Sequence, residues 1–109
     1  MITDKEVDDA LDWLLKYADK AAEARADRVW MEETSKALKA KLMKESGESS
    51  LGAQEREALA SDAYQTHLKG LRAAVYDDEI CRLKRASKEA LIEAWRTQSS
   101  NNRTLGKIG

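Results

Sequence analysis

Apolar residues recur at helical spacing from the beginning of the chain. Thr3 is followed three residues later by Glu6, which is typical of a capping box, so a helix is predicted to begin near Asp4. The apolar stripe continues without a proline or glycine and predicts one helix over residues 4–45. Its members are Val7, Ala10, Leu11, Leu14, Ala18, Ala21, Ala22, Val29, Met31, Leu38 and Leu42.

A second stretch of helical spacing follows a cluster of helix-breaking residues. Two glycines and three serines fall within residues 46–52, which predicts a turn. The apolar pattern then resumes and predicts a second helix over residues 53–98. Gly70 lies in its middle and indicates a close contact or a bend. Residues 99–109 are polar, and we expect them to form a flexible tail.

Composition and charge favour an all-α hairpin. The chain has 109 residues, 36% of them charged and none of them proline. Net charge alternates along it, at −5 over residues 1–35, +2 over 36–52, −3 over 53–81 and +5 over 82–109. Folding about the turn pairs opposite charges, which predicts an antiparallel two-helix hairpin. Because two helices leave much of each apolar stripe in water, we expect a homo-oligomer.

Several classes of protein are not expected. One histidine, one cysteine and no phosphate-binding loop offer no catalytic constellation, so we expect neither an enzyme nor a cofactor. His67 and Cys81 would lie about 21 Å apart along one helix, too far to share a metal. The acidic residues 77–79 point in different directions on a helix and are interpreted as a solvated face.

The cellular setting predicted from the sequence is cytoplasmic. No apolar run approaches the ~18 residues of a membrane span, so no membrane partner is expected. The first residues lack the basic and apolar regions of a signal peptide. The lone Cys81 cannot form an internal disulfide, which fits a reducing compartment. A net charge of −1 means that any site for a polyanion must be local.

The most informative stretch is a lysine-rich segment near the end of the first predicted helix. Leu38 and Leu42 share the apolar stripe, and lysines flank it on both sides. One interpretation makes these lysines edge residues that pair with Glu55, Glu57 or Asp62. The other makes them a positive rim, repeated by several subunits, that tracks a phosphate backbone. The lysines concerned are Lys36, Lys39, Lys41 and Lys44.

The run Leu-Lys-Ala-Lys-Leu at residues 38–42, followed by Ser46 and Gly47, resembles the basic motif of the UvsY family of phage recombination mediators. That resemblance implies a small helical oligomer that binds single-stranded DNA. Its partners would be a strand-exchange recombinase and a single-strand-binding protein in the host cytoplasm. The motif's DNA-binding residues correspond to Lys39 and Lys41. Trp13, Trp30 and Trp95 are interpreted as packing residues, and the alternative for Trp30, beside Arg28, is stacking on a base.

A second function of another class stays open. A phage-encoded helical adaptor or inhibitor would bind only protein, through a coiled-coil surface on its apolar stripe. The two functions differ in their dependence on salt, because phosphate contacts weaken steeply as salt rises and an apolar interface does not.

Overall fold

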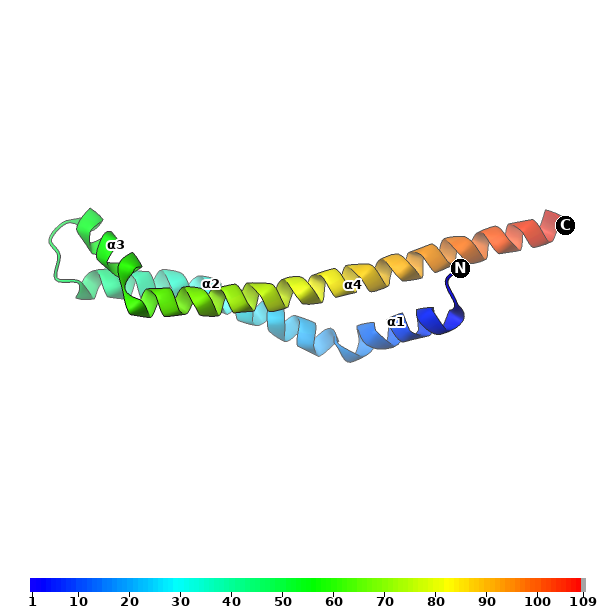
Figure 1. The fold of residues 1–109 in the computed structure, drawn as a ribbon, viewed down its shortest axis with the longest axis horizontal. Coiled ribbons are helices and arrows are strands. Elements are labelled where there is room, and N and C mark those ends of the chain that lie inside the picture. Colours follow the sequence, from blue (N-terminus) through cyan, green and yellow to red (C-terminus); the bar gives the residue numbers. More distant parts are fainter. Residues whose placement is uncertain (109) are drawn as a thin grey trace. The chain divides into compact units, whose positions relative to one another are not determined.

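The computed structural model describes the backbone of residues 1–108 and the side chains of residues 1–106. The predicted all-α class is confirmed, because every element in this part of the chain is a helix and no strand occurs in it. Figure 1 shows the element order along the chain. The helices are α1 (Asp4–Lys16), α2 (Ala18–Glu45), α3 (Leu51–Ala60) and α4 (Asp62–Ile108).

The first predicted helix is interrupted. Its cap is as predicted, since the side chain of Thr3 accepts a hydrogen bond from the backbone N–H of Glu6 at 3.2 Å. A single helix over residues 4–45 is wrong, because Tyr17 separates α1 from α2 with φ −101° and ψ 7°. The ring of Tyr17 stacks on Trp13, with ring centroids 5.2 Å apart.

The second predicted helix is divided as well. Residues 46–50 connect α2 to α3, with Gly47 at a φ of 77°, a conformation that favours glycine. Ser61 then separates α3 from α4, in extended conformation with ψ 148°. Its hydroxyl donates to the carbonyl of Ala58 at 2.8 Å and accepts from the N–H of Tyr64 at 3.2 Å. One serine therefore ends α3 and caps α4, which the apolar spacing alone did not predict.

The C-terminal segment also differs from expectation. Helix α4 does not end near residue 98 but continues to Ile108, so residues 99–108 are helical rather than an irregular tail. Residue 109 lies outside the described residues. The segment contains no proline, and the Thr104 hydroxyl bonds back to the carbonyl of Ser100 at 3.1 Å, which is compatible with a helix. Gly106 and the polar residues weaken the helix without breaking it.

The contacts divide the chain into two compact units. The terminal unit contains Met1–Ala21 and Ile80–Gly109, and the central unit contains Ala22–Glu79. In the terminal unit the backbone of Ile2 exchanges two hydrogen bonds with the side-chain amide of Gln98, at 3.1 and 2.9 Å. The indole N–H of Trp95 donates to Asp4 at 3.1 Å. These contacts hold the start of α1 against the late part of α4.

In the central unit, α2 lies beside the first part of α4. Arg28 contacts Asp78, and Met31 contacts His67, so residue numbers rise along one helix as they fall along the other. The two segments therefore run antiparallel within this unit.

Little apolar surface is buried. Among the side chains that the structure describes, the buried hydrophobic ones are Val7, Ala10 and Ala58. Many large apolar side chains are instead more than a third exposed, with Leu15 at 82% and Trp30 at 69%. The others are Met1, Leu11, Tyr17, Val29, Leu51, Leu59, Leu68, Tyr76, Leu83 and Leu105. Among the described residues, no helix is apolar enough over sufficient length to cross a membrane.

Candidate functional site

Lys39 forms a cross-helix ion pair. Its ammonium group donates to Glu55 on α3 at 2.8 Å, and its side chain is 34% exposed. This hydrogen bond raises the pKa of Lys39 above its usual value and lowers the pKa of Glu55. Of the three acidic partners considered from the sequence, Glu55 is the one at ion-pair distance. The edge-residue interpretation therefore describes Lys39.

The other three predicted lysines are exposed. Lys36 makes an ion pair with Glu33, one helical turn earlier, at 3.5 Å, and both side chains are largely exposed. For Lys41 and Lys44, both exposed, the described part of the chain provides no carboxylate at ion-pair distance. They are three residues apart and are neighbours on the helix surface.

The four lysines do not share one face of α2. At 100° per residue, Lys36, Lys44 and Lys41 follow one another around the helix at steps of about 80° and 60°. Lys39 lies about 160° from Lys41, on the side that meets α3. The exposed basic surface of this segment therefore consists of Lys36, Lys41 and Lys44, without Lys39.

Arg28 organises a polar cluster in the central unit. Its Nη1 donates to Asp78 at 3.1 Å and to Glu79 at 2.8 Å, and its Nε donates to Glu32 at 3.0 Å. Arg25 approaches Asp78 at 3.9 Å. The hydrogen bonds to Glu32, Glu79 and Asp78, in that order of size, raise the pKa of Arg28. The guanidinium is thus engaged by three carboxylates.

This cluster corrects the interpretation of residues 77–79 as a solvated face. Asp77 is exposed, but Asp78 is only 1% exposed and Glu79 is half-buried. A sequence signal was available, because Asp78 falls at helical spacing from Leu71 and Val75 on the stripe that faces α2. The burial of Asp78 is tolerated because a guanidinium neutralises it.

His67 bridges α4 and α2. Its Nε2 lies 3.0 Å from the carbonyl oxygen of Met31 and 3.5 Å from the hydroxyl of Thr34. The same carbonyl accepts from Ser35 at 2.8 Å. His67 is half-buried and is therefore placed as an interface residue. Cys81 is a half-buried free thiol, and the side chains described include no group of metal ligands.

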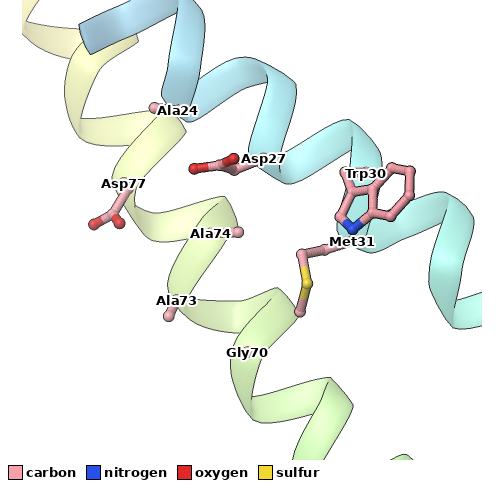
Figure 2. A pocket seen from close by; sticks show the side chains of 8 residues that line it. All are labelled: Ala24, Asp27, Trp30, Met31, Gly70, Ala73, Ala74 and Asp77. Carbon is pink, nitrogen blue, oxygen red and sulfur yellow. The ribbon is translucent and has the colours of Figure 1, made fainter.

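A shallow hollow of about 320 Å³ lies between α2 and α4 in the central unit. Figure 2 shows the side chain of Met31 reaching across toward Gly70. A Cβ on Gly70 would lie 2.7 Å from the Met31 methyl group, so the close contact indicated by this glycine is present. The exposed carboxylates of Asp27 and Asp77 line the hollow beside Trp30. Their charge repels phosphate and disfavours Trp30 as a platform for nucleic-acid bases.

Comparisons with protein-family models, curated proteins and solved structures gave no significant match. The function is therefore inferred from the residues of the chain itself.

Proposed function

We propose that this chain is a recombination mediator of the phage type. It assembles as a homo-oligomer of antiparallel helical hairpins, holds single-stranded DNA on lysines of α2, and assists the loading of a strand-exchange recombinase. Loading takes place in the presence of a single-strand-binding protein. No covalent step is involved.

The observation that carries the DNA-binding part is the exposure of Lys41 and Lys44 without an acidic partner among the described residues. A lysine already paired must break an ion pair before it binds phosphate, whereas these two can neutralise phosphates directly and release the counterions condensed on the strand. Lys36 adds a third charge, because its pair with Glu33 is exposed and such pairs contribute about 0–1 kcal/mol. Lys39 contributes less than the family resemblance implies, since Glu55 holds it.

Self-association is supported by the apolar surface. Exposed apolar side chains occur in both units, for example Leu15 in the terminal unit and Tyr76 in the central unit. Burying them against further copies stabilises each copy by removing apolar area from water.

A second candidate is the protein-only adaptor or inhibitor. Two observations favour it. Lys39 is engaged within the chain, and exposed apolar side chains outnumber the exposed lysines of α2. In this case the same helix faces bind a partner protein, and Lys41 and Lys44 serve solubility.

Fluorescence anisotropy of a labelled oligothymidine at three salt concentrations separates the two candidates. For the mediator, wild type binds at low salt, and Lys41→Ala/Lys44→Ala flattens the slope of log affinity against log salt by ~0.7 for each lysine that no longer binds a phosphate. The control Lys20→Ala/Lys69→Ala removes two exposed lysines elsewhere and should leave the slope unchanged. No binding by wild type at low salt overturns the mediator and leaves the adaptor.

A further inference from the structure

The continuation of α4 to Ile108 places Arg103 on the same helix as Arg85 and Arg96, from which the predicted flexible tail would have separated it. Arg85 and Arg103 are eighteen residues apart, which is five helical turns, so they point in the same direction. Arg96 lies between them and deviates by about 20°. The three arginines, named here the arginine stripe, span about 27 Å along the helix axis.

The arginine stripe is exposed and only weakly neutralised. All three side chains are exposed. Arg96 pairs with Glu93 at 3.2 Å, but both side chains are more than two-thirds exposed, so water screens the pair. Arg85 and Arg103 make no ion pair with the described side chains. Residues 82–109 carry seven basic and two acidic groups, the most positive block of the chain.

The stripe lies beside further polar side chains, of which the Trp95 indole and the Thr97 hydroxyl already donate to Asp4 and to the Glu93 carbonyl. A shallow hollow of about 560 Å³ adjoins Arg96 and Arg103 in the terminal unit. Hydroxyl, amide and indole groups line it, together with Glu93. Serine, threonine, asparagine and arginine side chains are the groups that contact phosphate and sugar in protein–nucleic acid interfaces. The lining residues whose side chains can make such contacts are Ser99, Ser100 and Asn101.

We propose that the arginine stripe is a second binding surface for the phosphate backbone of single-stranded DNA. The inference deepens the proposed mediator function and depends on it. A straight row of guanidinium groups on one helix follows a single strand, and the adjoining hollow offers space and donors for sugar and base. Arginine suits this task because its planar donor group engages phosphate oxygens in pairs.

Glu89 provides an internal test of the stripe. It lies between Arg85 and Arg96 along the axis and about 40° away from the line of Arg85 around the helix. Its exposed carboxylate repels a strand bound there. Removing that charge should therefore strengthen binding, an effect that partial unfolding of a variant does not mimic.

The experiment measures anisotropy of a labelled oligothymidine against salt for wild type and five variants, one of which is Lys41→Ala/Lys44→Ala. Arg85→Ala/Arg103→Ala should flatten the slope of log affinity against log salt by ~1.4, which is ~0.7 for each of two arginines. Glu89→Gln should tighten binding about 2–5-fold at low salt. The matched controls, Lys20→Ala/Lys69→Ala and Glu23→Gln, alter the same charges at exposed positions elsewhere and should match wild type.

The outcomes separate this inference from the function on which it depends. If wild type binds, Lys41→Ala/Lys44→Ala weakens binding and both stripe variants behave like their controls, the inference is overturned while the mediator stands. If wild type does not bind oligothymidine at low salt, both fail. Equal or tighter binding to a duplex of the same length also overturns the single-strand assignment.

Discussion

The Nη1 atom of Arg28 lies 3.1 Å from a carboxylate oxygen of Asp78, fifty residues later in the chain. Asp78 is 1% exposed, the most deeply buried charged side chain of those described. This pair joins α2 to α4 inside the central unit, where few apolar side chains are buried. A buried ion pair is neither strongly favourable nor unfavourable as a whole, but breaking it leaves one charge without compensation.

Arg28→Met is therefore expected to lower the Tm by roughly 10–20 °C, because the buried Asp78 carboxylate loses the guanidinium group that neutralises it. Thermal unfolding followed by circular dichroism measures the change. Arg25→Met is the matched control and should leave the Tm nearly unchanged, since Arg25 is 63% exposed and lies 3.9 Å from Asp78. The double variant Arg28→Met/Asp78→Leu should regain part of the loss. Equal effects of the two single arginine variants would contradict the assigned role of Arg28.

The contact between Met31 and Gly70 predicts a coupling between two substitutions. In a Met31→Ala background, Gly70→Ala should stabilise the protein by ~1 kcal/mol, the helix-propensity difference between the two residues. With Met31 present, the new Cβ would meet the Met31 methyl at 2.7 Å, so the methionine must move and the gain shrinks. Chemical denaturation of the four proteins in this cycle gives the coupling energy. A coupling of zero contradicts the close approach.

The Lys39–Glu55 pair predicts a pH window for the contact between α2 and α3. The pKa of Glu55 is lower in the folded state than in the unfolded state, where it is ~4.3. The ionised Glu55 carboxylate therefore stabilises the folded state above pH ~4.3, and this stabilisation is lost as pH falls through the folded-state pKa. The pKa of Lys39 is higher in the folded state than in the unfolded state, where it is ~10.4. The charged Lys39 ammonium group therefore stabilises the folded state below pH ~10.4, and this stabilisation is lost as pH rises through the folded-state pKa. The stabilisation is complete between these limits.

NMR chemical shifts of α3 amides measure this window. In wild type they should change as pH falls below the usual glutamate range, because the hydrogen bond from Lys39 is broken. In Glu55→Gln that step should disappear, while Glu57→Gln serves as the matched control and should retain it. A step that persists in Glu55→Gln would assign the titration to another carboxylate.

Helix content could be predicted from the sequence because its determinants are local. Apolar spacing, the absence of proline and the Thr3 cap act within a few residues. The sequence contains a signal for the interruption at Ser61, namely a serine followed by an acidic residue at the start of a helix. The sequence contains no comparable signal at Tyr17, where the helix is interrupted by the backbone conformation of this one residue.

The candidate sites could be predicted less well, because they depend on contacts between segments that are far apart in the sequence. Opposite charges suggested three partners for the lysines of α2, but the selection of Glu55 depends on α3 being a separate short helix. The acidic run alone does not predict the pair of Arg28 and Asp78, because only its position on the apolar stripe distinguishes Asp78 from its exposed neighbour Asp77. The arginine stripe requires Arg103 to be helical, whereas the polar residues after Gln98 predict an irregular tail.

Self-association should depend on the apolar surface of α1. Leu11 and Leu15 are one turn apart on this helix and are 45% and 82% exposed, so they present a continuous apolar edge. Light scattering of wild type at micromolar concentration should give a mass above the 12.2 kDa of one chain. Leu11→Asp/Leu15→Asp should lower that mass, because burying two carboxylates in an interface costs more than the apolar contacts contribute.

The matched control is Leu105→Asp, at a position that is 67% exposed within the segment after Gln98. Leu105 is the one apolar side chain among residues 101–106, so this segment offers little apolar surface, and truncation after Ser100 should also leave the mass unchanged. A monomeric wild type with full helicity contradicts the assembly. A lower mass in Leu105→Asp or in the truncation would instead locate the interface on the end of α4. That result would also place Arg103 inside a contact between copies, where it could not bind DNA.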